Sequence, residues 1–112
     1  MLRDYMIKIQ SKFADPDEVS AYMSKIPNTA HIKYKKENDT YIAYVDSVDN
    51  EKIKGLLITE STSVEELVDN LNGLIYMNAE IPEKLRPYYG NRFSFPIEGK
   101  LRKSGELNLV KA

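Results

Sequence analysis

One amphipathic segment, from about Val64 to Met77, constrains the fold of this chain more than any other feature of its sequence. Ser63 stands before it as an N-cap and Glu66 follows three residues later, which is the spacing of a capping box. One face then repeats with the helical period of about 3.6 residues, at Val64, Leu67, Val68, Leu71, Leu74, Ile75 and Asn78. The pattern predicts a helix that must bury this face against another layer of structure.

Two elements are predicted before residue 30. Apolar side chains alternate along Tyr5 to Lys12, which indicates a strand with one buried face. Asp15 then offers a helix cap, and Pro16 suits the first position of a helix. The helical spacing continues to Ile26, where the following proline ends the helix.

Three strands are predicted between the two helices. The β-prone segments Ala30 to Lys36 and Thr40 to Asp46 are joined by a short polar stretch, which is typical of a hairpin. In the second segment both sets of alternating positions are apolar, as in a central strand. An apolar run from Ile53 to Thr59 predicts a third strand, in which Gly55 is expected to mark a bulge.

The remainder of the chain is less regular. Ile81 to Pro87 can form at most one helical turn between two prolines, and Tyr88 to Asn91 has the chemistry of a turn. Arg92 to Ile97 predicts a strand, and its proline places that strand at an edge of the sheet. The end of the chain has two interpretations: a short strand around Leu107 to Val110, or a loose tail or hairpin over about residues 100–112.

The predicted order of elements is βαβββαβ, with the terminal strand as an addition. Both helical stripes are buried at once if two helices pack on one face of a mostly antiparallel sheet, so the expected fold class is α+β. A single domain over residues 1–112 is expected, because no repeat or linker divides the chain. Periodicity leaves two variants open, a ferredoxin-like plan with an inserted strand and a βββαβ unit with an N-terminal extension.

Composition excludes several classes of protein. Cysteine is absent, so disulfides, thiolate metal sites and a cysteine nucleophile are excluded. No apolar run approaches the roughly 20 residues that span a bilayer, and the N-terminus lacks the pattern of a signal peptide. We therefore expect a soluble, cytoplasmic protein with no membrane association.

No catalytic set is found. His31 is the single histidine, which rules out a triad or a multi-histidine metal site. Phosphate-binding loops, dinucleotide fingerprints and nucleophile elbows are missing. Asp46, Asp49 and Glu51 share a loop but do not follow the pattern of a calcium-binding loop. The sequence predicts no catalytic residue, no metal and no cofactor. An enzyme is the third and least favoured hypothesis, with a carboxylate cluster around Asp46, Asp49, Glu51 and Glu60 as its one conceivable site.

Charge is unevenly distributed along the chain. Residues 1–36 carry seven basic and four acidic side chains, residues 37–83 carry two and eleven, and residues 84–112 carry seven and two. Either the folded chain interleaves these segments and neutralises them, or an acidic face and basic ends meet partners of opposite charge.

Two non-enzymatic functions are compatible with this pattern. The leading hypothesis is a protein-interaction or regulatory module that binds another protein, or a second copy of itself, through the acidic outer face of the predicted helix. That face comprises Glu65, Glu66, Asp69 and Asn72. The alternative is a single-stranded nucleic-acid-binding protein, in which rings stack on bases and basic groups contact phosphates. Its candidate residues are Arg86, Tyr88, Tyr89, Arg92, Lys100, Arg102 and Lys103.

Part of the chain resembles the HicB-like antitoxin domains. The three predicted strands and the helix over residues 32–77 look like that family's plan of three strands followed by a capped acidic helix. The string Thr62 to Leu71 is similar to the family's helix opening, and Tyr41 to Val45 looks like its aromatic second strand. The family's Gly-Cys pair and its DNA-binding helix pair have no counterpart here. The resemblance implies a partner-binding role.

Overall fold

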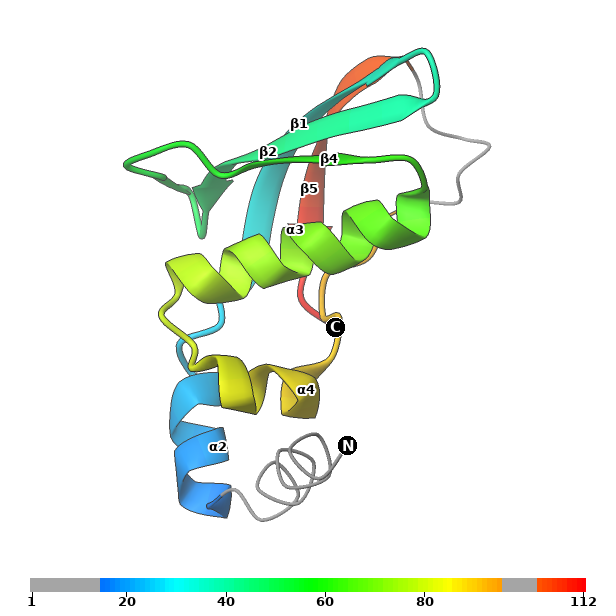
Figure 1. Cartoon of the computed structure of the whole chain (residues 1–112). Coiled ribbons are helices and arrows are strands. Elements are labelled where there is room, and N and C mark those ends of the chain that lie inside the picture. Colours follow the sequence, from blue (N-terminus) through cyan, green and yellow to red (C-terminus); the bar gives the residue numbers. More distant parts are fainter. Residues whose placement is uncertain (1–14, 96–102) are drawn as a thin grey trace, which may run out of the picture.

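An antiparallel sheet with a long helix against one face organises the molecule (Figure 1). The computed structural model describes residues 15–95 and 103–112. In chain order its elements are α2 (Pro16–Met23), β1 (Thr29–Glu37), β2 (Thr40–Val48), β3 (Glu51–Lys52), β4 (Ile58–Ser61), α3 (Val64–Asn78), η1 (Glu83–Leu85), α4 (Arg86–Tyr89) and β5 (Ser104–Val110). The strand expected at Tyr5 to Lys12 lies outside the described residues.

Over the described residues the sheet has five strands in the order β3-β2-β1-β5, and β4 also pairs with β2. Every strand pair in the described part of the chain is antiparallel. β5, near the end of the chain, pairs with β1. The register places Thr29 opposite Val110 and Lys35 opposite Ser104. The predicted α+β class and antiparallel sheet are confirmed.

Short polar residues set the turns between β1, β2 and β3. The predicted hairpin of β1 and β2 turns at Asn38, whose φ of 56° lies in the left-handed region that asparagine tolerates. Asp49 and Asn50 have φ angles of 48° and 66°, as a two-residue hairpin loop between β2 and β3 requires. Asp46 is an extra residue of β2 opposite the His31–Ile32 step, so β2 carries a bulge there.

The third predicted strand, Ile53 to Thr59, is wrong in its extent. Only β3 before it and β4 from Ile58 onward join the ladder, and the residues between them form a loop. Ile53 still continues the register of β3, because its N–H donates to the Asp46 carbonyl at 3.2 Å. The Val45 N–H donates to the Leu57 carbonyl at 2.9 Å in the register of β4, so the residues between Ile53 and Leu57 loop out opposite the Val45–Asp46 step. Gly55 lies in this loop and not at a bulge within a strand.

The core lies between α3 and the inner face of the sheet. Alternate residues of β1 and β2 are buried, and α3 contributes Leu67, Leu71 and Ile75, which are fully covered. The predicted cap is confirmed, since the Glu66 N–H donates to Ser63 Oγ at 3.2 Å. The other residues of the predicted helical stripe are buried or half-buried, and only its last residue, Asn78, is exposed.

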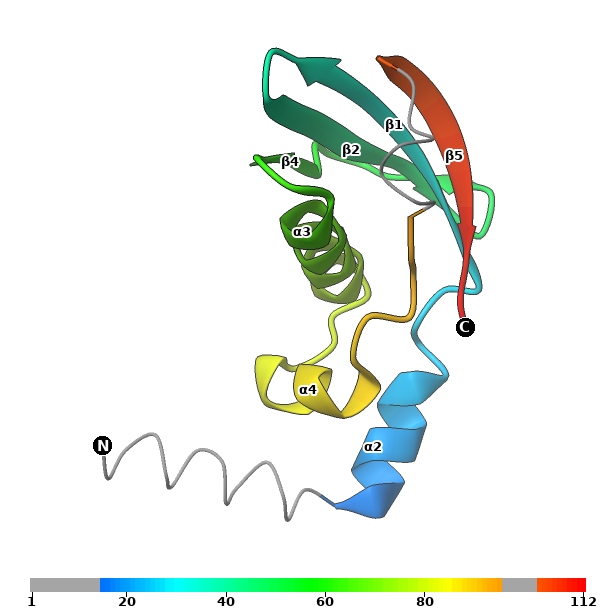
Figure 2. The same ribbon diagram turned by 90° about the vertical axis from the view of Figure 1, so that its right-hand side faces the viewer.

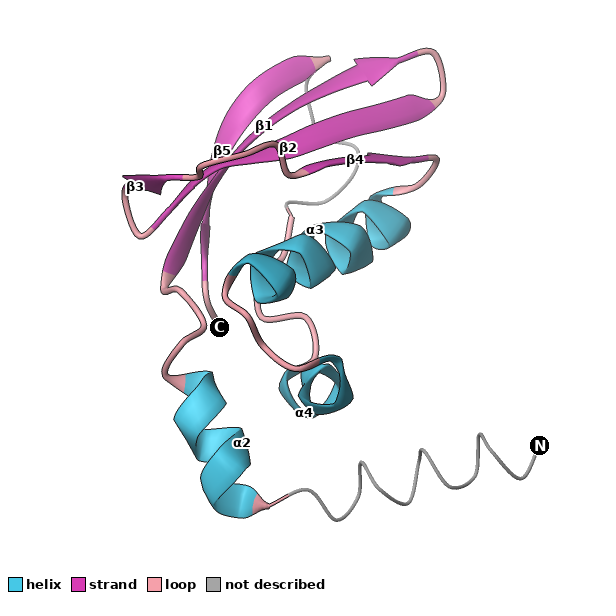
Figure 3. Cartoon of the chain, turned by 60° about the vertical axis from the view of Figure 1, so that its left-hand side comes forward, coloured by secondary structure: helices cyan, strands magenta, loops and turns pink. Residues whose placement is uncertain are grey.

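The two predicted helices do not pack equally closely on the sheet. α3 packs on β2 and β4, whereas α2 lies beside α4, farther from the strands (Figure 3). The Tyr89 hydroxyl donates to the Val19 carbonyl at 2.6 Å, and Lys84 Nζ lies 3.5 Å from Glu18 Oε1. Asp15 caps α2 by accepting from the Asp17 N–H at 2.9 Å.

The chain after α3 differs from the prediction in two places. Residues 83–89 form η1 and α4 in succession, so helical structure continues past Pro87 into the expected turn. No strand forms over residues 92–95, and the remaining two residues of that predicted strand lie outside the described part. The end of the chain is β5, which begins three residues before the expected Leu107.

Candidate functional site

The acidic face expected on α3 lies only partly at the surface. The side chains of Glu65, Glu66 and Asp69 are exposed, but Asn72 is only 1% exposed. The expectation that Asn72 belongs to the outer face is therefore wrong. Its side of the helix is covered by the chain that returns after α4, which periodicity within α3 alone does not reveal.

Asn72 holds that returning chain in place. Its Nδ2 donates to the Phe93 carbonyl at 2.7 Å, and its Oδ1 accepts from the Phe93 N–H at 3.0 Å. The Asn72 amide thus bonds both the N–H and the C=O of Phe93, the two backbone groups with which Phe93 would otherwise bond to a neighbouring strand. This explains why residues 92–95 do not join the sheet. An amide in the interior of an amphipathic helix is the only sequence signal of this contact.

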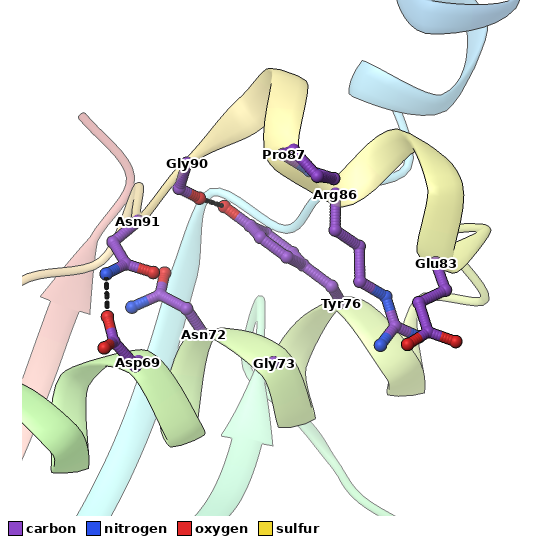
Figure 4. Close-up of a pocket in the computed structure, with 9 residues that line it drawn as sticks. All are labelled: Asp69, Asn72, Gly73, Tyr76, Glu83, Arg86, Pro87, Gly90 and Asn91. Atoms are coloured by element: carbon purple, nitrogen blue, oxygen red, sulfur yellow. Dashed lines mark hydrogen bonds between the residues drawn. The ribbon is translucent and has the colours of Figure 1, made fainter. Parts of the chain in front are cut away.

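A shallow hollow of about 410 Å³ lies between α3 and the segment from η1 to Asn91 (Figure 4). The Tyr76 hydroxyl donates to the Gly90 carbonyl at 2.5 Å, and Asn91 Nδ2 donates to Asp69 Oδ1 at 2.5 Å. Most polar groups around the hollow therefore hold the two segments together. The described residues around the hollow include no nucleophile paired with a base. We call this hydrogen-bonded contact between α3 and the following segment the seam.

Two buried tyrosine rings pack beneath this seam. Tyr76 and Tyr89 meet edge to face, with ring centroids 6.2 Å apart and an interplanar angle of 64°. Burial raises the pKa of the Tyr76 hydroxyl, and the nearby Arg92 opposes that shift. Burial also raises the pKa of Tyr89, and the carboxylate of Glu18 adds to the effect. Both hydroxyls are therefore held in the neutral form.

Alkaline pH is accordingly expected to destabilise the fold, and Tyr76→Phe is expected to reduce that sensitivity. Below the ordinary tyrosine pKa of about 10 both states hold the phenolic proton, so the stability is fully present. As the pH rises toward the raised pKa of the folded state, the unfolded chain ionises first and the free energy of unfolding falls. Urea unfolding at pH 8 and pH 11 measures the decrease, and an undiminished decrease in the variant would contradict the assignment.

The basic and aromatic residues of the C-terminal third do not form one exposed patch in the described part of the chain. Tyr89 is buried. Arg92 lies beside the end of β5, where its Nε donates to the Tyr89 carbonyl at 2.8 Å and its Nη1 to the Ala112 carbonyl at 3.2 Å. Lys103 lies at the opposite end of β5. Arg86 and Tyr88 belong to α4, and Lys100 and Arg102 lie outside the described residues.

One of the loop carboxylates, Asp49, accepts backbone hydrogen bonds. Asp49 Oδ1 accepts from the Asn28 N–H at 2.8 Å and from the Thr29 N–H at 3.0 Å, which fixes the entry to β1. Over residues 15–95 and 103–112, no three histidine or carboxylate groups come together as a metal site would require. His31 is half-buried, and its Nδ1 lies 2.8 Å from Asn108 Oδ1.

The face of the sheet turned away from α3 carries apolar side chains where polar ones are the rule. All helices of the described chain lie on the other side (Figures 1 and 3). The register places Ile58, Tyr44 and Lys33 in one row across β4, β2 and β1, and it places Glu60, Ile42 and Lys35 in the next row. We call these six residues the open face.

The open face combines an apolar centre with charged sides. A hollow of about 340 Å³ lies over Ile42, Tyr44 and Ile58 and is flanked by Lys33 and Lys35. Ile58 is 48% exposed, although its neighbours on β2 are half-buried. Lys33 Nζ lies 3.5 Å from Glu106 Oε1.

Electrostatics keep Lys33 charged on this face. The neighbouring Tyr44 raises the pKa of Lys33 most, followed by the carboxylate of Asp46, and Glu106 acts in the same direction. The sequence signal for the open face was present in β2, whose two faces are both apolar. Periodicity could not show that only one of them is covered.

Comparison with protein-family models, curated proteins and solved structures finds no match to this chain. None of the helices in the described part is both long and apolar enough to cross a membrane.

Proposed function

We propose that this protein is a non-enzymatic protein-interaction module that holds its partner on the open face of its sheet. The observation that carries the proposal is the contiguous apolar centre formed by Ile42, Tyr44 and Ile58 on a face that no described element covers. Contiguous exposed apolar surface on a soluble domain is typical of interaction sites.

The distribution of residue types also fits a protein partner. Interfaces commonly have an apolar or aromatic centre and a polar rim. Here Tyr44 and Ile42 occupy the centre, with Lys33 and Lys35 on one side and Glu60 on the other. The resemblance to HicB-like antitoxin domains supports a partner-binding role independently of this face.

The acidic residues of α3 offer a matched comparison. Glu65 is exposed on α3, the helix that covers the other face of the sheet, whereas Ile58 belongs to the open face. A photo-crosslinking residue at position 58 is expected to capture a partner protein in cells, and the same residue at position 65 is not. Ile42→Glu should abolish the capture from position 58, because it places a charge in the apolar centre.

Three outcomes would decide against the open face. Equal capture from both positions, or capture that survives Ile42→Glu, would show that contact is not specific to this surface. Capture from position 65 alone would favour the acidic helix face. Crosslinking to nucleic acid instead of protein would favour the nucleic-acid-binding alternative.

A further inference from the structure

We propose that β5 is the pairing strand of a homodimer, in which a second copy of the chain adds its own β5 antiparallel to the first and continues the sheet across a twofold axis at Leu107. The backbone geometry of β5 and the order of its side chains favour this pairing independently of the open face.

The backbone of β5 is unpaired along one side. In the described part of the chain β5 forms the edge of the sheet next to β1, and none of the described helices lies beyond it (Figure 2). The Lys36 N–H donates to the Lys103 carbonyl at 2.6 Å, and the Lys111 N–H donates to the Asn28 carbonyl at 2.8 Å. Odd-numbered residues of β5 therefore bond to β1, because the bonding direction alternates along a strand.

The even-numbered residues direct their N–H and C=O groups outward. These residues are Ser104, Glu106, Asn108 and Val110. No described residue forms a backbone hydrogen bond with these outward groups. Unpaired groups of this kind make an edge strand a template for another strand.

β5 also lacks the features with which proteins usually protect an edge. The strand contains no proline, its register with β1 runs without a bulge from Ser104 to Val110, and Glu106 is its single charged residue. Val110 is 68% exposed at its end. The edge is therefore regular enough for a second strand to pair along its full length.

The order of side chains selects one register for two identical strands. A twofold axis at Glu106 places that carboxylate opposite its own copy, which is unfavourable. An axis at Asn108 places Glu106 opposite Val110 and extends the pairing to Ala112, whose N–H is already bonded to the Arg92 carbonyl at 2.8 Å. An axis at Leu107 avoids both problems and places Glu106 opposite Asn108 of the other copy.

The Leu107 register completes the bonding of the strand. Glu106 pairs with Asn108, and Ser104 pairs with Val110, so each outward residue donates and accepts one hydrogen bond across the edge. Leu107, which is only partly buried, lies against its own copy. Lys111 falls opposite Lys103 of the other copy. The Lys111 ammonium group donates to the Ile26 carbonyl of its own chain at 3.4 Å.

Single cysteines test this register, because the chain has none of its own. In this register Leu107 and its own copy form a non-hydrogen-bonded pair, in which the Cα atoms lie about 4.5 Å apart. Leu107→Cys is therefore expected to form a disulfide-linked dimer under mild oxidation. Val110→Cys is the control, since its own copy lies about 20 Å away at the rise of an antiparallel strand. Equal crosslinking of both variants, or none at position 107, would overturn the proposal.

Charge at position 108 provides a second test in the full chain. Asn108→Asp places a carboxylate opposite Glu106 in both symmetry-related pairs and is expected to weaken the dimer about tenfold, whereas Asn108→Lys should strengthen it. Analytical ultracentrifugation over a range of concentrations measures both, and Asn78→Asp, at the exposed end of α3, should leave the dissociation constant unchanged. A strict monomer, or a dimer indifferent to both substitutions, would contradict the proposed edge. Loss of dimerisation with intact capture from position 58 would separate this inference from the proposed function.

Discussion

Replacing Phe93 by alanine is expected to lower the free energy of unfolding by about 4 kcal/mol. The Phe93 side chain is fully buried, and it belongs to the segment that connects α4 with the rest of the chain. Truncation removes the transfer free energy of the ring and leaves a cavity that a well-packed core fills only in part. Urea denaturation monitored by circular dichroism measures the loss.

Phe95→Ala is the matched control for this prediction. Phe95 is only partly buried, and it meets Tyr34 edge to face with ring centroids 6.3 Å apart. Its truncation should cost about 1–2 kcal/mol, because less apolar surface returns to water. Equal losses for the two variants would mean that Phe93 is not the deeper anchor of this segment.

The elements that the sequence predicted best are those whose signals are local. The cap at Ser63 and the periodic stripe behind it define α3 from residues that lie within one helix. The hairpin of β1 and β2 follows in the same way from two neighbouring β-prone segments and the Asn38 turn between them. Such signals do not depend on where distant parts of the chain lie.

The errors arise where a contact with another element decides the structure. Ile53 to Thr59 has the apolar composition of a strand, but the residues between Ile53 and Leu57 loop out opposite the Val45–Asp46 step of β2. Residues 92–95 alternate like a strand, yet Phe93 is bonded to a side chain of α3 instead of to a strand. In both cases a contact with another element decides the outcome, and the composition of the segment itself does not.

The candidate interaction surfaces show the same limit. The sequence predicted partner binding by the acidic helix face and nucleic-acid binding by the C-terminal rings, because charge and composition can be read along the chain. The structure buries Asn72 and Tyr89 and leaves Ile58 exposed on the open face. Which face of β2 is covered depends on where α3 packs, and periodicity in β2 does not contain that information.

Asn72→Leu is expected to cost about 3 kcal/mol, although it exchanges a polar residue for an apolar one of similar size inside a helix. The substitution removes both partners of Phe93, and its buried N–H and C=O groups then lack hydrogen bonds. Each unpaired backbone group costs roughly 1–3 kcal/mol, which exceeds what the extra apolar contact returns. Faster hydrogen exchange at the Phe93 amide should accompany the loss in urea stability.

The control for this prediction is Asn78→Leu, because Asn78 lies at the exposed end of the same helix. Its effect should stay within about 0.5 kcal/mol, as is usual for surface substitutions. Because Asn72 and Phe93 attach the same segment to α3, the double variant Asn72→Leu/Phe93→Ala should lose less stability than the two single variants added together. Strict additivity, or a stable Asn72→Leu variant with unchanged exchange at Phe93, would show that the amide does not hold this segment.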